Sequence, residues 1–259
     1  MFIHSLAFFE KTFKEFIRDR ATLFWTIAWP SVWLLLMSTV FTRGIAEDIL
    51  PQVTGMMTIS MVGLALMTSG MVNLAGSIAG DRQRGVYQKI TSMPVKAWED
   101  AVGRLGGLLA FALVSSLLVL AVGLALGARF SGSVVELLQC IGCALLVLLA
   151  SNGVGMIIGS IATSEGSATH IGVGVTVITG FIGGVFISYS ALPEFLQLFS
   201  QLYPPSSAIS SITYILEGEI YAGYNPLAAG NMIYTVVCSL AIFVLGLIIY
   251  GQRLWSNRF

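Results

Sequence analysis

Charged residues are scarce in this sequence. Only 10% of the 259 residues are Asp, Glu, Lys or Arg, whereas 56% are hydrophobic. A soluble domain typically carries about 25% charged and about 45–50% apolar residues. The formal net charge is zero, so no overall basic character points to a nucleic-acid partner. This composition excludes an ordinary soluble domain and favours an integral membrane protein.

Residues suited to catalysis or metal binding are also few. The sequence contains two histidines, His4 and His170, and three cysteines, Cys140, Cys143 and Cys238. Two of the cysteines have a C-x-x-C spacing, but the further ligands of a metal site and the context of a redox motif are both missing. H-E-x-x-H and G-x-S-x-G motifs do not occur. We therefore predict that the chain is not an enzyme.

The sequence also lacks the P-loop pattern G-x-x-x-x-G-K-[ST]. Ionisable residues are missing from the middle of the apolar segments, where a proton- or sodium-coupled transporter usually carries them. If the protein moves a solute, we expect the energy to come from a separate polypeptide. Two alternatives stay open: an ATPase-independent secondary transporter or channel, and a membrane scaffold that transports nothing.

Long apolar segments dominate what is present. A spanning helix needs about 20 mainly apolar residues. Six segments qualify, at residues 22–42, 55–79, 102–127, 134–162, 169–190 and 232–251. We predict an all-α integral membrane fold with six transmembrane helices, forming a single domain over residues 1–259 with no nucleotide-binding domain.

The lysines and arginines are distributed unevenly around these segments. With both termini inside, eleven of the thirteen lie on the inner side, and only Arg43 and Arg129 lie outside. Positive residues accumulate in cytoplasmic flanks. We therefore predict a multi-pass protein of the cell membrane with cytoplasmic N and C termini.

Residues 1–20 have the pattern of a helix lying on the membrane surface. One apolar face is formed by Phe2, Leu6, Phe9, Phe13, Phe16 and Ile17. Such a helix should lie in the interface, with its basic residues toward the headgroups of membrane lipids. A secretory signal peptide is the alternative, but acidic residues in the segment and the lack of a small-residue cleavage site argue against it.

The connection at residues 191–231 is long, semi-apolar and free of Lys and Arg. Pro204 and Pro205 divide it into two pieces that are too short to span the membrane. We predict a re-entrant helical pair on the outer side before the last span, with an ordinary surface loop as the alternative.

The most polar stretch lies between the second and third predicted spans, at residues 80–96. It begins "GDRQRGVYQKITSMPV". Gly85 permits a tight turn, residues 86–92 can form about two helical turns, and Pro94 ends them. A short, rigid loop joined to two spans is suited to receive force from a docked partner.

This stretch resembles the cytoplasmic loop of the ABC-2 family of ABC-transporter permeases, whose pattern is E-R-x-x-G-T-x-x-x-L-x-x-x-P-[VIL]. Four positions match in register, at Arg82, Gly85, Pro94 and Val95. Asp81 and Ile90 are conservative replacements, whereas Val86 replaces the usual Thr. The predicted order of elements along the whole chain is also similar to that of the family.

The resemblance implies a permease subunit of an ATP-driven exporter that moves a hydrophobic, lipid-like, drug-like or glycan-linked substrate outward. It implies a separate P-loop ATP-binding subunit, which would hold ATP and Mg²⁺, and a second permease copy, identical or a sister chain. The loop would be the coupling helix, with coupling residues Asp81, Arg82, Gly85, Tyr87, Ile90 and Pro94.

Two asparagines, Asn73 and Asn152, are the most polar residues deep in the predicted spans. Polar side chains in lipid need partners, so we expect both to face the bundle interior, where they line a substrate path or only join helices. Glycines spaced by four residues allow close helix packing, within one subunit or in a dimer. They occur as Gly76/Gly80, Gly103/Gly107 and Gly155/Gly159.

Overall fold

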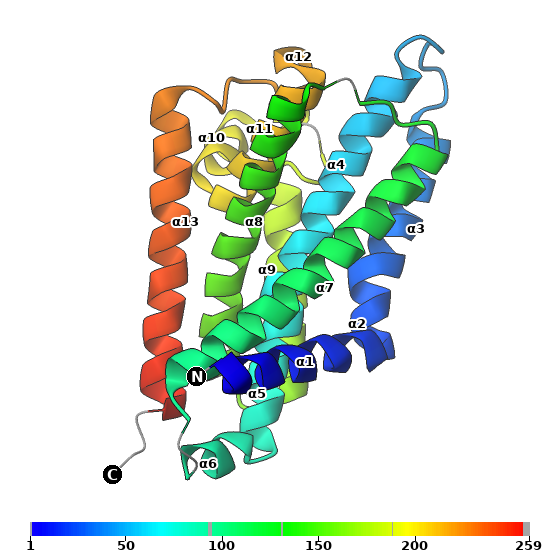
Figure 1. Cartoon of the computed structure of the whole chain (residues 1–259). Coiled ribbons are helices and arrows are strands. Elements are labelled where there is room, and N and C mark those ends of the chain that lie inside the picture. Colours follow the sequence, from blue (N-terminus) through cyan, green and yellow to red (C-terminus); the bar gives the residue numbers. More distant parts are fainter. Residues whose placement is uncertain (1, 93–94, 131, 188, 256–259) are drawn as a thin grey trace.

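The computed structural model describes residues 2–92, 95–130, 132–187 and 189–255, which form helices and turns without a strand (Figure 1). The α-helices are α1 Phe2–Arg18, α2 Arg20–Leu23, α3 Trp29–Leu36, α4 Leu50–Thr68, α5 Ala75–Gln83, α6 Val86–Thr91, α7 Ala97–Ala125, α8 Val134–Ile161, α9 Glu165–Ile182, α10 Glu194–Leu202, α11 Pro204–Glu217, α12 Glu219–Ala222 and α13 Ala229–Tyr250. Wider π-helical segments join two α-helices, as η1 Phe24–Ala28 and η3 Ser69–Leu74 do, or extend the end of one, as η2 Met37–Phe41 and η5 Gly251–Trp255 do.

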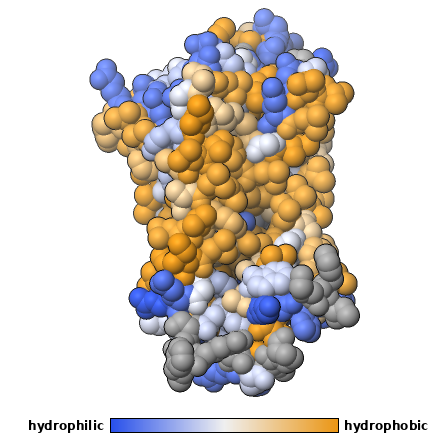
Figure 2. All heavy atoms as spheres, turned by 60° about the vertical axis from the view of Figure 1, so that its left-hand side comes forward, coloured by the Kyte–Doolittle hydropathy of each residue, from blue (hydrophilic) through white to orange (hydrophobic). Residues whose placement is uncertain are grey.

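Five continuous helical stretches are long and apolar enough to cross a membrane. They are Arg20–Val40, Leu50–Gln83, Ala97–Ala125, Val134–Ile161 and Ala229–Trp255. Figure 2 shows that apolar side chains cover the middle of the face in view, whereas hydrophilic ones gather at its two ends. The all-helical class is confirmed, and the pattern is that of a multi-pass membrane protein.

The fifth predicted span, residues 169–190, corresponds to α9, which is not among these five stretches. The helix ends at Ile182, earlier than predicted, because the chain turns at Gly183 and at Gly184, whose φ is +82°. That angle lies in the left-handed region, which glycine adopts without steric cost. The count of six spans stays a prediction.

The first helix, α1, lies across the other helices near one end of the bundle and packs against α7 (Figure 1). Two glycines of α7 permit this approach. A Cβ atom at Gly103 would meet the Cβ of Phe8 at 2.5 Å, and one at Gly107 would meet the carbonyl oxygen of Phe9 at 2.7 Å. This predicted glycine pair therefore serves packing within the subunit.

The long helix formed by α4, η3 and α5 runs through the centre of the bundle and is largely buried. A Cβ at Gly155 of α8 would collide with the carbonyl oxygen of Gly70, and one at Gly159 would meet that of Ala75 at 2.8 Å. A Cβ at Gly76 would meet Thr169 of α9 at 2.9 Å. All three predicted glycine pairs thus contact helices of the same chain.

The segment before the last span divides at the prolines as predicted. Helix α10 ends at Leu202, and α11 begins at Pro204, where a missing backbone N–H costs nothing. Helix α11 packs against α8, α4 and α13, at the end of the bundle opposite to α6 (Figure 1). Whether the pair re-enters a membrane stays a prediction.

Candidate functional site

The end of the second span and the polar stretch after it form a helical elbow, which we define as residues 75–91: α5, Arg84, Gly85 and α6. Helix α5 continues through Gln83, and Gly85 then adopts φ +69° and ψ +21°. The following six residues form α6, as predicted for residues 86–92. The left-handed conformation explains the glycine, because an L side chain there would strain the backbone. Pro94 lies outside the described residues.

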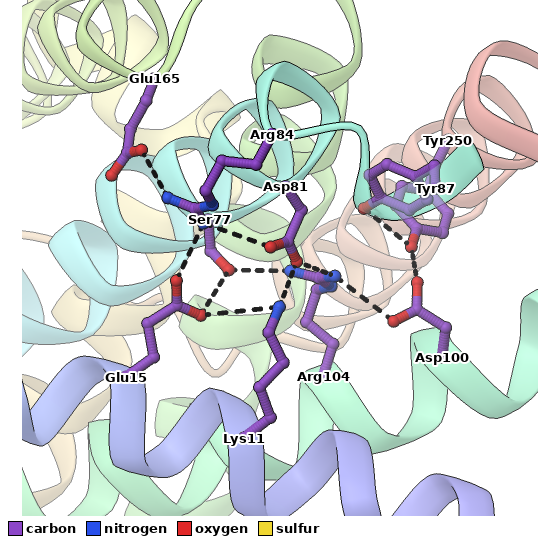
Figure 3. A network of polar contacts seen from close by, with 10 residues as sticks. All are labelled: Lys11, Glu15, Ser77, Asp81, Arg84, Tyr87, Asp100, Arg104, Glu165 and Tyr250. Atoms are coloured by element: carbon purple, nitrogen blue, oxygen red, sulfur yellow. Dashed lines mark hydrogen bonds and ion pairs between the residues drawn. The ribbon is translucent and has the colours of Figure 1, made fainter. Parts of the chain in front are cut away.

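The carboxylate of Asp81 lies at the centre of an ion-pair network and is completely buried (Figure 3). Its Oδ2 accepts hydrogen bonds from Lys11 Nζ at 2.5 Å and from Arg104 Nη2 at 2.7 Å, while Oδ1 accepts from Arg84 Nη2 at 3.2 Å. Three cations from α1, α7 and the elbow therefore share one carboxylate. This arrangement joins the three elements.

Arg104 extends the network into α7. Its Nη1 donates to Ser77 Oγ at 2.8 Å and its Nη2 to Asp100 Oδ1 at 3.3 Å. The guanidinium also lies 5.9 Å from the ring centre of Tyr87 in α6, within the range of a cation–π contact. Its side chain is 2% exposed, so its charge depends on these partners.

The last span joins the network through Tyr250. Its hydroxyl donates to Asp100, and it lies 3.2 Å from the hydroxyl of Tyr87. The ring of Tyr87 also contacts Trp255 edge to face. Burial raises the pKa of Tyr87 well above its ordinary value, so its hydroxyl stays protonated at neutral pH. Helix α6 is thereby held to both α7 and α13.

Arg82 serves a different structural purpose. Its guanidinium donates to the carbonyl oxygen of Ser160 at 2.8 Å and to that of Ala162. Both carbonyls lie at the C-terminal end of α8, where the last carbonyls lack partners within the helix. Arg82 therefore fastens the elbow to the end of α8.

The elbow has a buried face and an exposed face. Asp81, Tyr87 and Ile90 are buried against the subunit itself. The exposed residues of the elbow are Gln83, Arg84, Gln88 and Lys89. A partner could touch the second group directly, whereas Asp81, Tyr87 and Ile90 are covered by the subunit itself.

Several members of the network were not singled out from the sequence: Lys11, Glu15, Asp100, Arg104 and Tyr250. Asp100 and Arg104 are spaced i, i+4 on one helix, which is a recognisable pairing signal. Tyr250 carries no such local signal, because its partners lie far away in the chain.

A cavity of about 380 Å³ lies beside this network, lined by α1, α2, η1, the η3–α5 helix and the start of α9. Asn73 lines it, and its side-chain amide donates to Thr26 Oγ1 at 2.8 Å. Its backbone belongs to the π-helical segment η3, a departure from α-helix often found at functional sites. We call this the inner cavity.

A second cavity, of about 320 Å³, lies toward the opposite end of the bundle. Four methionines line it, Met37, Met56, Met57 and Met61, together with aromatic and small residues that include Phe186 and Tyr189. Methionine side chains are flexible and polarizable, so such a wall adapts to apolar ligands of different shape. We call this the outer cavity.

Asn152 is not among the residues that line the inner or the outer cavity. It lies on α8, where η3 crosses closely at Gly70, and its buried Oδ1 has no hydrogen-bond partner among the described residues. The two asparagines that the sequence grouped together thus have different surroundings. The described residues also contain no cluster of three His, Cys, Asp or Glu side chains that could hold a metal ion.

Comparison with known protein families matches residues 5–216 to the family described as ABC-2 type transporter. No curated protein matches the sequence. The matched range contains the elbow, most of the ion-pair network and the residues of the inner cavity. Because the match covers far more than half of the chain, the protein belongs to the ABC-2 type transporter family and is a membrane-spanning permease of ABC-type transport.

Proposed function

We propose that this chain is the permease subunit of an ATP-driven exporter and that the elbow receives the movement of a separate P-loop ATPase, which binds ATP and Mg²⁺. The observation that carries the proposal is the division of the elbow into two faces. One face is exposed, and the other is fixed by the ion pairs of Asp81 to α1 and α7 and by the hydroxyl contact of Tyr87 with Tyr250 of α13.

The orientation follows from the basic residues. In our proposal the end with α1, α6 and both termini faces the cytoplasm, and α9 is the fifth of six spans. Arg43 and Arg129 are then the only lysines or arginines outside. The helices α10 and α11 would form the external re-entrant pair.

Force applied to α6 would reach the spans by two routes. Asp81 connects the elbow to α7 through Arg104 and to α1 through Lys11. Tyr87 connects α6 to α13 through Tyr250. Breaking a buried ion pair costs about 3–5 kcal/mol. The elbow and the adjoining helix ends should therefore move as one rigid body.

A row of aromatic rings supports a substrate path between the two cavities. Trp25 lines the inner cavity and lies 5.7 Å from Trp29, measured between ring centroids; Trp29 lies 6.1 Å from Trp33. Trp33 in turn lies 5.8 Å from Phe186, which lines the outer cavity. A hydrophobic or amphiphilic substrate would find apolar contacts along the whole row.

The proposal includes a second permease copy, identical or a sister chain. The glycine pairs are occupied within the subunit, so they do not provide the dimer surface. Exposed apolar side chains on the first span, such as Val32, Leu35 and Leu36, offer one.

Purification in mild detergent, followed by mass spectrometry, tests the proposal. We expect a P-loop ATPase to co-purify in stoichiometric amount and to be lost with Lys89→Glu. Arg43→Glu, which reverses an exposed charge at the opposite end, is the matched control and should retain the ATPase. An intact oligomer without any ATPase, in a detergent that preserves other ABC complexes, would favour a secondary transporter or channel instead.

A further inference from the structure

The inner cavity has a strongly one-sided charge. Three carboxylates line it, from Glu15, Asp19 and Glu165, whereas no lysine or arginine occurs among the described residues of its wall. The remaining polar side chains of the wall carry three hydroxyls, the amide of Asn73, the indole N–H of Trp25 and the imidazole of His170. This lining disfavours an anionic ligand.

The cations near these carboxylates only partly compensate them. Arg84 donates to Glu15 Oε1 at 3.2 Å and to Glu165 Oε2 at 3.0 Å, while Lys11 Nζ lies 3.9 Å from Glu15. Both cations are also engaged by Asp81. Asp19 has no ion-pair partner among the described residues and instead caps the start of α2.

Other parts of the wall suit a cation as well. Asn73 is 6% exposed, and its amide oxygen has no hydrogen-bond donor among the described residues. Trp25 and Phe16 contribute aromatic rings, whose faces attract cations. Carboxylates, an amide oxygen and aromatic rings are the groups that bind an ammonium ion.

We propose that the inner cavity binds the ammonium head of a cationic amphiphile, with its apolar chain following the rings of Trp25, Trp29 and Trp33. This inference rests on the proposed function, because it names the class of substrate that the permease would take up. The head contacts Glu15, Glu165 and the amide oxygen of Asn73, and the chain enters the aromatic row.

Binding at this position is linked to the elbow. An ammonium ion beside Glu15 and Glu165 competes with Arg84 for the same two carboxylates. Arg84 would then depend more on Asp81, its remaining partner in the network. Occupation of the cavity is thereby communicated to the segment that contacts the ATPase.

Photolabelling of the permease alone, in lipid nanodiscs without the ATPase, tests the site. Three probes have the same alkyl chain and differ only in the head group, which is a primary ammonium, a hydroxyl or a sulfonate. Each carries a photoreactive diazirine on the chain close to the head group. We expect only the ammonium probe to label residues around Trp25 and Thr169. Glu165→Gln should reduce this labelling about tenfold, the loss expected for one charge-assisted contact.

The control variant is Glu194→Gln, which removes an exposed carboxylate at the opposite end of the bundle and should leave the labelling unchanged. Glu15→Gln repeats the test at a second carboxylate, so that a folding defect in one variant does not decide the result. Equal labelling by the hydroxyl or sulfonate probe, or full labelling of both Gln variants, would overturn the inference. The permease function itself is decided separately, by co-purification of the ATPase.

Discussion

At the end of the bundle that carries α1 and α6, polar side chains are buried in ion pairs; at the other end, a methionine-lined cavity has no ion pair among its described residues. Around Asp81, the hydrogen bonds from Lys11 and Arg104 have a defined direction and join helices far apart in sequence. Around the outer cavity, the walls consist of flexible thioethers and aromatic rings.

The difference suggests a division of tasks within one subunit. Charged hydrogen bonds are directional and expensive to break, so they transmit displacement without yielding. A cavity wall of methionine side chains changes conformation easily and can therefore fit ligands of different shape. In the proposed exporter, the rigid element lies where the ATPase would apply force and the adaptable one where the substrate would leave.

Removal of the central carboxylate should have the largest effect. Asp81→Asn leaves the buried guanidinium of Arg104 without one of the two carboxylates that balance its charge. We expect the free energy of unfolding to fall by about 3 kcal/mol. Chemical denaturation in detergent measures it. Asp48→Asn, at an exposed position near the opposite end, is the control and should change little. A similar loss of unfolding free energy in both variants would show that the end around Asp81 is no more rigid than the opposite end.

Straightening the elbow should have a smaller effect on stability and a large one on coupling. Gly85→Val forces a β-branched residue into φ +69°, at a cost of about 1–2 kcal/mol. We expect ATP hydrolysis by the assembled complex to continue while transport falls. Gly142→Val, at a helical glycine whose Cβ would meet open space, is the matched control. Normal transport by Gly85→Val would exclude the elbow from the mechanism.

Methionine replacement in the outer cavity should be tolerated. Met57→Leu keeps the volume and the apolar character of the wall, so the stability loss should stay below about 1.5 kcal/mol. The range of transported substrates should narrow, because leucine is less flexible. A stability loss as large as that of Asp81→Asn would show that the outer end is as rigid as the inner one.

The last prediction concerns a carboxyl group in α11. Burial raises the pKa of Glu217 to about 7, from an ordinary value of 4.5. The neutral form is thus favoured in the folded state, and its stabilising contribution is complete below pH 4.5 and is lost as pH rises through 7. Thermal unfolding midpoints between pH 5 and pH 8 should fall for the wild type and stay flatter for Glu217→Gln. Parallel curves would assign the pH dependence to other groups.

Features with a local cause were predictable from the sequence. Proline is excluded from a helix interior and favoured in the first turn, as at Pro204, and Gly85 makes a left-handed turn that other residues adopt only with strain. The apolar segments similarly predict spanning helices from composition alone.

Features that depend on packing between distant segments were not predictable. From the sequence, Arg104 was only one of the eleven basic residues assigned to the inner side. Its burial could not be predicted, because it follows from the way α1 and α5 pack against α7. The glycine pairs were recognised as contact sites, but their partners emerged only from the folded chain. Asn152 and Asn73 looked equivalent in sequence and are not equivalent in space.

The central claim is that a separate ATPase contacts the exposed face of α6. We would place the photocrosslinker benzoylphenylalanine at position 89, irradiate native membranes, and identify the adducts by mass spectrometry. Our account predicts a P-loop ATPase crosslinked from position 89 and none from position 43 at the opposite end. No ATPase adduct from position 89, or the same adduct from both positions, would contradict it.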